Sequence, residues 1–306
     1  MFSRFYDPDR VGQLYAPNVS MAVEMGRSAG LAASSTDRTR ILLLLIDMQV
    51  DFVHRDGALS VPGAVEDARR TIEWLLRHTP VITTVAASLD SHVPLQIFSQ
   101  AWWVDETGRH PAPFTVITSE DAISGRWLPL YEPEWSLDYV RKLEQQAKKA
   151  LMIWPYHTLV GTVGHSLTPA LYEAIAYHAS ARQSQPVFLG KGSIPKTEHY
   201  SIIEPEVKVP EQPLGSVNTE FLDLIASYQR VYIAGQAKSH CVLETISSLI
   251  RHFEEQPEVI RRLHLLTDCT SSVAHPEIDF DAMAEETLVK FSQQGLQLVK
   301  SSDALL

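Results

Sequence analysis

Short apolar runs alternate with amphipathic stretches from residue 41 to the end of the chain. The apolar runs are too short for helices and are rich in Val, Ile and Leu, so they predict buried strands. These strands are expected at Ile41–Ile46, Val81–Ala86, Leu151–Trp154, Val187–Leu189, Val231–Ala234, Leu263–Thr267 and Leu296–Val299. Apolar residues at three- and four-residue spacing predict helices between the strands. These helices are expected at Val65–His78, Leu137–Ala150, Leu167–Ala181, Thr219–Tyr228, Cys241–Phe253 and Ala282–Gln293.

The alternation of strands and helices predicts a three-layer α/β/α fold with a doubly wound, mostly parallel sheet. Ligands of such sheets bind at the carboxyl ends of the strands. Five candidate positions follow a predicted strand immediately or within a few residues, namely Asp47, Asp90, His157, Lys191 and the turn 235–241. We therefore expect these five strand ends to meet at one rim of the sheet.

Two segments do not follow the alternation. Residues 99–136 show little periodicity but contain four of the six tryptophans, which argues against disorder. This insertion is expected to be a lid or rim of the site or, equally, a satellite cluster on the sheet edge or a subunit contact. Residues 1–38 are expected to form an irregular arm on the surface or on a partner subunit. Residues 39–306 are expected to form a single domain.

The composition narrows the choice of partners and compartment. Hydrophobic residues make up 45% and charged residues 21% of the 306 residues, which is typical of globular proteins. The formal net charge of −11 disfavours nucleic acid and anionic membranes as partners. The longest apolar run is far shorter than the roughly 20 residues that span a bilayer. Two cysteines cannot form a disulfide framework, and the polar N-terminus does not resemble a secretory signal, so a cytoplasmic location is expected.

Three side chains at the predicted rim suit nucleophilic catalysis, although each has an ordinary explanation when taken alone. Cys241 opens a predicted helix, where the helix dipole stabilises a thiolate, but a lone cysteine is more often a small buried hydrophobe. Asp47 follows an aliphatic run, so desolvation should raise its pKa and suit it as a base, but it could equally cap a turn. Lys191 is ambiguous, because most lysines at strand ends simply reach water.

Taken together, three blocks resemble the signature of nicotinamidases and related cysteine hydrolases. The blocks are Ile46-Asp47-Met48-Gln49-Val50-Asp51-Phe52, the step Lys191-Gly192 followed by Tyr200-Ser201, and Gly235-Gln236-Ala237-Lys238-Ser239-His240-Cys241-Val242. The resemblance covers roughly residues 40–300, interrupted by the insertion. It implies an isochorismatase-like hydrolase fold and an assembly of two or more identical subunits.

The resemblance also implies a mechanism. Asp47 would be the base, Lys191 the electrostatic partner and Cys241 the nucleophile in the hydrolysis of a small amide such as nicotinamide. The reaction would form a thioester with loss of ammonia, and water would then attack the thioester. A cis peptide bond is implied between Gln236 and Ala237, and the backbone N–H groups of Ala237 and Cys241 would form the oxyanion hole.

A second group of residues suits a divalent metal. Asp90 and His92, two residues apart on an extended segment, can turn to the same side, and a carboxylate with imidazoles suits zinc, iron or manganese. With His157, which ends a Trp-Pro-x-His block typical of nicotinamidases, they resemble the nicotinamidase metal site. Many nicotinamidases have a further histidine shortly after the Asp-x-His pair, where this chain has Gln96. Seven other histidines are expected at the surface or as caps, namely His54, His78, His110, His178, His252, His264 and His275.

The pocket and the wider function complete the set of expectations. Candidate pocket residues are Phe52, Gln96, Trp102, Trp103 and His240. The leading hypothesis is an amidohydrolase acting on a small molecule. The alternatives are isochorismatase-type or ureido and carbamoyl hydrolysis on the same fold, and a non-catalytic ligand-binding or assembly module.

Overall fold

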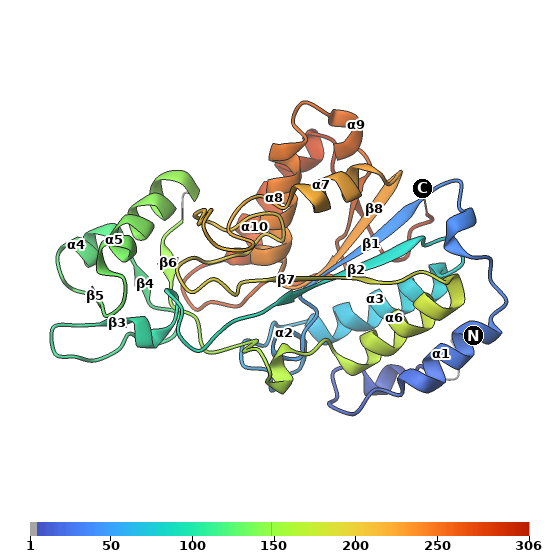
Figure 1. The fold of residues 1–306 in the computed structure, drawn as a ribbon, viewed down its shortest axis with the longest axis horizontal. Helices are drawn as coiled ribbons and strands as arrows, with labels where there is room; N and C mark the ends of the chain where they lie inside the picture. The colour runs from blue at the N-terminus through green and yellow to red at the C-terminus, as the bar shows by residue number, and fades with distance from the viewer. Residues whose placement is uncertain (1–4, 148, 306) are drawn as a thin grey trace.

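The computed structural model describes residues 5–147 and 149–305, and its centre is a six-stranded parallel sheet (Figure 1). The strand order is β10-β9-β8-β1-β2-β7, which confirms the predicted doubly wound α/β architecture. The strands are β1 (Ile41–Ile46), β2 (Thr84–Asp90), β7 (Val187–Lys191), β8 (Arg230–Gly235), β9 (Leu263–Leu266) and β10 (Gln297–Val299). Strand β2 begins three residues later than predicted and continues to Asp90, so both Asp90 and Lys191 are the last residues of their strands.

Helices cover both faces of the sheet. One face carries α1 (Val19–Ser28), α3 (Ala64–His78) and α6 (Pro169–Arg182), and the other carries α7 (Thr219–Ala226), α8 (Leu243–His252), α9 (Pro257–Ile260) and α10 (Phe280–Gln293) (Figure 1). Because successive strand residues point to opposite faces, Leu43 and Leu45 of β1 join one core while Leu42 and Leu44 join the other. This double burial explains why the β1 sequence is apolar at every position.

The tryptophan-rich insertion is part of a separate lobe, which we call the inserted lobe and define as residues 99–152. It contains β3 (Trp103–Val104), β4 (Val116–Ile117), α4 (Ser119–Ile123), β5 (Leu128–Pro129), α5 (Pro133–Lys142), a π-helix (Leu143–Ala147) and β6 (Leu151–Met152). One strand prediction is wrong here, and one helix prediction is confirmed with other bounds. The predicted strand Leu151–Trp154 is shorter and pairs antiparallel with β4 instead of joining the sheet. The predicted helix at 137–150 begins at Pro133 and packs within the lobe; residue 148 lies outside the described residues.

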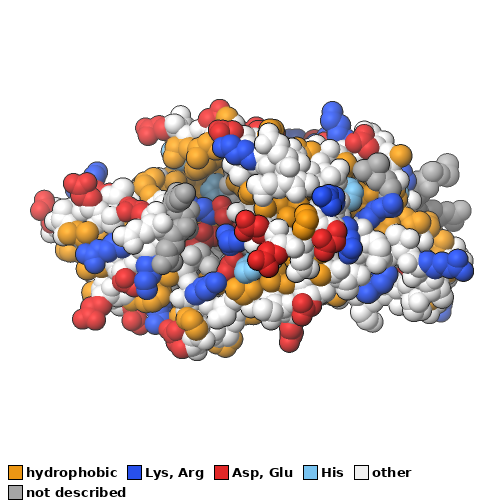
Figure 2. All heavy atoms as spheres, turned by 90° about the horizontal axis from the view of Figure 1, so that it is seen from above, with side chains coloured by type: hydrophobic (Ala, Val, Ile, Leu, Met, Phe, Trp, Pro, Cys, Tyr) orange, Lys and Arg blue, Asp and Glu red, His pale blue; other side chains and the backbone are white. Residues whose placement is uncertain are grey.

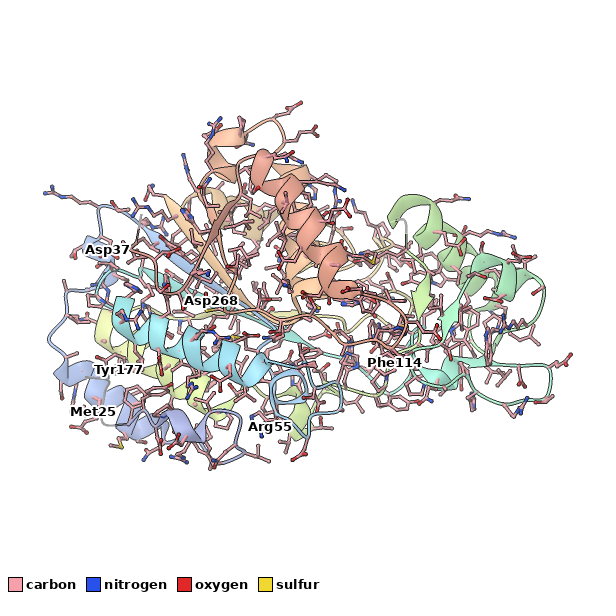
Figure 3. All side chains as sticks on the ribbon, turned by 180° about the vertical axis from the view of Figure 1, so that it is seen from behind. Met25, Asp37, Arg55, Phe114, Tyr177 and Asp268 are labelled. Carbon is pink, nitrogen blue, oxygen red and sulfur yellow. The ribbon has the colours of Figure 1, made fainter. Side chains whose placement is uncertain are left out.

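The predicted irregular arm contains a regular helix that packs on the same chain. A Cβ at Gly26 of α1 would lie 2.5 Å from the carbonyl oxygen of Tyr177 in α6, so the two helices cross closely. Met25 and Tyr177 lie on these neighbouring helices (Figure 3). The Asn18 backbone N–H donates to Glu173 Oε1 at 2.6 Å. Residues 5–38 therefore extend the helical layer; residues 1–4 lie outside the described residues.

The remaining elements are short. They are 3₁₀-helices at Pro8–Arg10, Ser34–Thr36, Gln100–Trp102 and Val163–His165, the helix α2 (Val50–Val53) and a π-helix at Lys238–Val242. Acidic and basic side chains are interspersed over the face seen in Figure 2. No helix among the described residues is long and apolar enough to cross a membrane.

Candidate active site

Three strand ends bring a carboxylate, an ammonium group and a second carboxylate together. Asp47 follows β1 directly, and Asp90 and Lys191 are paired in register at the ends of β2 and β7. Lys191 Nζ lies 2.9 Å from Asp47 Oδ2 and 2.8 Å from Asp90 Oδ1. All three side chains are buried. The parallel register of the sheet thus places one ammonium group between two carboxylates.

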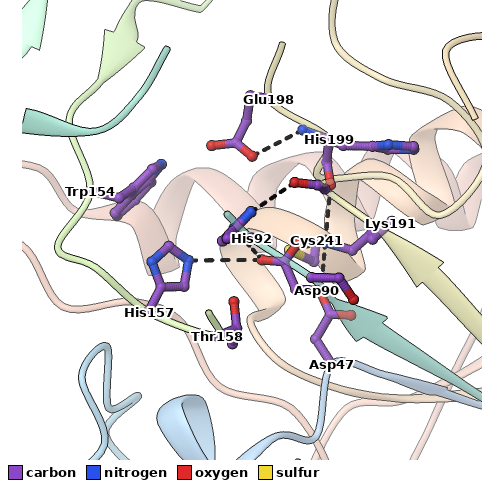
Figure 4. Close-up of polar contacts among 12 residues, drawn as sticks. Asp47, Asp90, His92, Trp154, His157, Thr158, Lys191, Glu198, His199 and Cys241 are labelled. Atoms are coloured by element: carbon purple, nitrogen blue, oxygen red, sulfur yellow. Dashed lines mark hydrogen bonds and ion pairs between the residues drawn. The ribbon is translucent and has the colours of Figure 1, made fainter. Parts of the chain in front are cut away.

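The turn after β8 places Cys241 beside this group. Gly235 has φ +131°, and a Cβ there would lie 2.0 Å from the Ile46 carbonyl oxygen, so only glycine allows β8 to end this close to β1. The Gln236 N–H donates to the same carbonyl at 2.8 Å, and the peptide bond between Gln236 and Ala237 is cis. Cys241 Sγ lies 3.6 Å from Lys191 Nζ. The structure therefore brings Asp47, Lys191 and Cys241 together (Figure 4).

Asp47 is held in place by its neighbour on β2. The Ser88 hydroxyl donates to Asp47 Oδ1 at 2.6 Å and accepts the Asp47 backbone N–H at 3.0 Å. Asp47 has φ 44°, in the left-handed region that aspartate tolerates better than most residues. The strand end and Ser88 together aim Oδ2 at Lys191.

Burial decides the protonation of the catalytic candidates. Burial raises the pKa of Asp47, as the sequence predicts, and the Asp90 carboxylate adds to the rise while Lys191 opposes it. Burial also raises the pKa of Cys241 well above its ordinary value, and Asp47 and Asp90 add to this. The Lys191 ammonium opposes this rise, but burial keeps the resting thiol protonated. Burial disfavours the Lys191 ammonium, but the two carboxylates raise its pKa well above the usual range.

The candidate metal ligands converge next to Lys191. One oxygen of Asp90 and one nitrogen from each of His92 and His157 all lie within 4.8 Å of one another. His92 Nδ1 faces the Gly192 carbonyl at 3.0 Å, and His157 Nδ1 faces the Pro155 carbonyl at 2.7 Å. A carbonyl only accepts, so each Nδ1 carries the proton and each Nε2 points to the carboxylate (Figure 4).

This donor set fits a divalent metal ion. Asp90 Oδ2 lies 2.8 Å from His92 Nε2 and 3.8 Å from His157 Nε2. Burial, followed by the nearby His92, lowers the pKa of His157 to about 4, so its imidazole is neutral, the form that binds metal. Burial opposes the charged form of His92, but the Asp90 carboxylate raises its pKa, so this imidazole would release a proton when a metal binds. Three protein ligands would leave positions open for water or substrate, as in catalytic zinc sites.

Gln96 supports the cluster instead of joining it. Its amide donates to the carbonyl oxygens of Gly192 at 2.7 Å and Ile194 at 3.3 Å. Gly192 has φ +78°, and a Cβ there would lie 2.5 Å from Asp90 Oδ1 and 2.9 Å from His92 Cε1. The lysine-glycine step therefore needs its glycine so that the backbone can approach the cluster.

The predicted pocket residues separate into two groups. Phe52 contacts the His157 ring edge-on at 5.4 Å, and His240 lies near the site. Trp102 and Trp103 are only 3% and 0% exposed, and their indole N–H groups donate to Ser136 Oγ and the Ile97 carbonyl. They belong to the core of the inserted lobe, and their place in the substrate pocket stays a prediction.

Comparison with known proteins identifies the fold. No protein-family model matches the sequence, and no curated protein matches it. Among solved structures, an Acinetobacter baumanii nicotinamidase/pyrazinamidase aligns with a TM-score of 0.58 and 18% identity, over 88% of this chain and 100% of that chain. The chain has a nicotinamidase-like fold.

Two further solved structures share this nicotinamidase-like fold. The yeast nicotinamidase Pnc1p, bound to the inhibitor nicotinaldehyde, aligns with a TM-score of 0.56 and 16% identity, over 85% of this chain and 99% of that chain. A Pyrococcus horikoshii pyrazinamidase in complex with zinc aligns with a TM-score of 0.50 and 19% identity, over 85% of this chain and 98% of that chain. At these identities the likeness establishes the fold.

Glu198 and a group of aromatic residues lie close to the candidate metal ligands and to His240. Burial raises the pKa of Glu198 to about 7, and the carboxylate lies near His92 (Figure 4). The rings of Trp154, Tyr200 and Phe280 surround His240, with centroids 5.2, 5.5 and 4.9 Å from its ring. We call these four residues the aromatic wall. A cavity of about 450 Å³ lies beside it and is lined in part by Tyr200, His240 and Phe280, and by none of the catalytic or metal-ligand candidates.

Proposed function

We propose that this protein is a cysteine-dependent amidohydrolase that converts a small primary amide, such as nicotinamide, to its acid and ammonia. The observation that carries the proposal is the position of Lys191. Its ammonium group lies within 3.6 Å of Cys241 Sγ and within hydrogen-bond distance of Asp47 and Asp90. Covalent catalysis requires a nucleophile beside a base and a group that stabilises charge. Here Cys241, Asp47 and Lys191 meet in this way.

In the proposed reaction Asp47 accepts the thiol proton as Cys241 Sγ forms a bond to the amide carbonyl carbon. Because the resting thiol is protonated, this transfer accompanies attack, and Lys191 stabilises the negative charge. The backbone N–H groups of Ala237 and Cys241 would donate to the developing oxyanion. Asp47 then returns the proton to the leaving nitrogen, which departs as ammonia. Water attacks the thioester, releases the acid and restores the thiol.

Asp90, His92 and His157 would hold the metal ion of the proposed enzyme. A bound zinc, iron or manganese ion would supply a Lewis acid that orients the substrate ring nitrogen and water. The Glu198 carboxylate, with its raised pKa, would accept a proton from water on this side of the site. The aromatic wall would pack against a flat substrate ring.

The test is ammonia release by purified protein from nicotinamide and a panel of small primary amides, ureas and carbamates. Cys241→Ala is the test variant, and Cys269→Ala is its matched control, because Cys269 is also buried but lies outside the site. We expect release by the wild type and by Cys269→Ala, and none by Cys241→Ala. Activity on ureido substrates alone would move the protein to the ureido and carbamoyl hydrolases, and no release from any compound would contradict the proposal.

A further inference from the structure

The inserted lobe is attached to one irregular segment of the site, residues 194–200. Two side chains of α5 in the lobe reach this segment. The Trp135 indole N–H donates to the Lys196 carbonyl at 2.8 Å, and the Tyr139 hydroxyl accepts the Glu198 backbone N–H at 3.1 Å. Trp135 and Tyr139 are four residues apart, so they lie on one face of α5. The contact is therefore made by one helix face with two anchors.

Segment 194–200 carries three groups that face the site. The His199 carbonyl accepts a hydrogen bond from Lys191 Nζ at 3.0 Å. The Glu198 carboxylate lies near His92, and the Tyr200 hydroxyl accepts the Trp154 indole N–H at 3.0 Å. The segment belongs to none of the sheets, so the position of these groups depends on contacts made by neighbouring parts of the chain.

The start of the segment is held by residues that precede the lobe. Gln96 binds the Ile194 carbonyl at 3.3 Å, and the Ile97 N–H donates to the Pro195 carbonyl at 2.8 Å. Beyond Pro195, the Glu198 N–H donates to the Tyr139 hydroxyl, whose ring is fully buried, and the Glu198 carbonyl accepts the Glu206 N–H at 2.9 Å. Loss of the hydroxyl would leave a buried N–H without its acceptor, a state that proteins avoid by moving the backbone.

We propose that α5 of the inserted lobe is a positioning element of the site, in which Tyr139 and Trp135 set the place of Glu198. The inference rests on the proposed function, because segment 194–200 borders the proposed site: its Glu198 carboxylate lies near His92, and its His199 carbonyl binds Lys191. The lobe is then part of the catalytic structure and not only a cover or a satellite cluster.

Tyr139→Phe tests the proposal with the ring retained. Tyr131→Phe is the matched control, since Tyr131 lies in the same lobe with 41% of its surface exposed. We expect Tyr139→Phe to lower kcat about tenfold and Tyr131→Phe to leave it unchanged. Because Tyr139 acts through Glu198, the double variant Tyr139→Phe/Glu198→Gln should be no slower than Glu198→Gln alone. Additive losses in the double variant, or an unchanged kcat in Tyr139→Phe, would overturn the inference.

Hydrogen exchange gives a readout that does not need activity. In Tyr139→Phe and in Trp135→Phe, amides of segment 194–200 should exchange faster than in the wild type, while amides of β1 and β8 keep their wild-type rates. Unchanged exchange in segment 194–200 in both variants would overturn the inference. Absence of ammonia release by the wild type would defeat the proposed function instead, and the exchange result alone would then decide whether α5 holds the segment.

Discussion

Substitution of Gly192 by alanine tests the close approach of the backbone to the metal ligands. A residue with a Cβ in the left-handed conformation found here, φ +78°, costs about 1–2 kcal/mol. The added Cβ would also lie 2.5 Å from Asp90 Oδ1 and 2.9 Å from His92 Cε1, so one of these side chains must move. Changes next to metal ligands typically lower affinity about 10–100-fold. We expect zinc affinity to fall at least about tenfold, which corresponds to about 1.4 kcal/mol.

Gly108→Ala is the matched control for this experiment. Gly108 has φ +82°, and no atom lies within 4 Å of the place its Cβ would take. Gly108→Ala should lose about 1–2 kcal/mol of unfolding free energy in urea through the conformational cost, and Gly192→Ala should lose at least as much, because its Cβ also clashes with Asp90 and His92. Only Gly192→Ala should lose zinc affinity in competition with a chromophoric chelator. Equal zinc affinities in the two folded variants would refute the reasoning.

Three further substitutions test the support of the site and of the core. Ser88→Ala removes the hydroxyl that orients Asp47. Because hydrogen bonds to charged groups contribute about 1.5–3 kcal/mol, kcat for ammonia release should fall about tenfold or more. An unchanged kcat would contradict this role of Ser88. Lys191→Met leaves two buried carboxylates without their cation and should lower the unfolding free energy in urea at pH 7 by about 3–5 kcal/mol, whereas a change below about 1 kcal/mol would contradict the buried pairing. Burial lowers the pKa of His178 from 6.5 to about 4, so the unfolded chain binds more protons between these values and stability is lost as the pH falls through that window. The pKa shift of about 2.5 corresponds to roughly 3 kcal/mol. Between pH 7 and pH 4 the unfolding free energy, measured in urea, should therefore fall by about 3 kcal/mol less in His178→Gln than in the wild type. An equal fall in both proteins would contradict a buried neutral imidazole.

The central sheet and its strand ends could be predicted because their signals are local. Ile41–Ile46 is apolar at every position because both faces of β1 are buried. The turn after β8 is recognisable from the block 235–241. Strand β2 was displaced in the prediction because its end carries Ser88 and Asp90, polar residues that the site needs and that a hydrophobic pattern does not register. The sequence predicts that His157 follows a strand of the central sheet. The residue does lie beside Asp90, but the strand before it, β6, pairs with β4 in the inserted lobe.

The residues that the sequence did not reveal depend on contacts between distant segments. The prediction of surface or capping positions is wrong for His54, His178 and His264, which are all buried. The His178 ring bonds to the Ile82 carbonyl, 96 residues away. Glu198 and Tyr139 meet across 59 residues of chain, and Glu198 lies in a segment without periodicity. Hydrophobic period describes the face of a single element, so it carries no information about such pairs.

The central claim is that Cys241 carries the acyl group of the substrate, and rapid-quench mass spectrometry tests it most directly. Wild-type protein is mixed with excess nicotinamide, quenched in acid within the first turnover and digested, with Cys241→Ala and Cys269→Ala treated in the same way. The account predicts that the mass of the Cys241 peptide increases by that of the acyl group less one hydrogen, in the wild type and in Cys269→Ala. Ammonia release by Cys241→Ala at the wild-type rate, with no acyl group on Cys241 in the wild type, would contradict it.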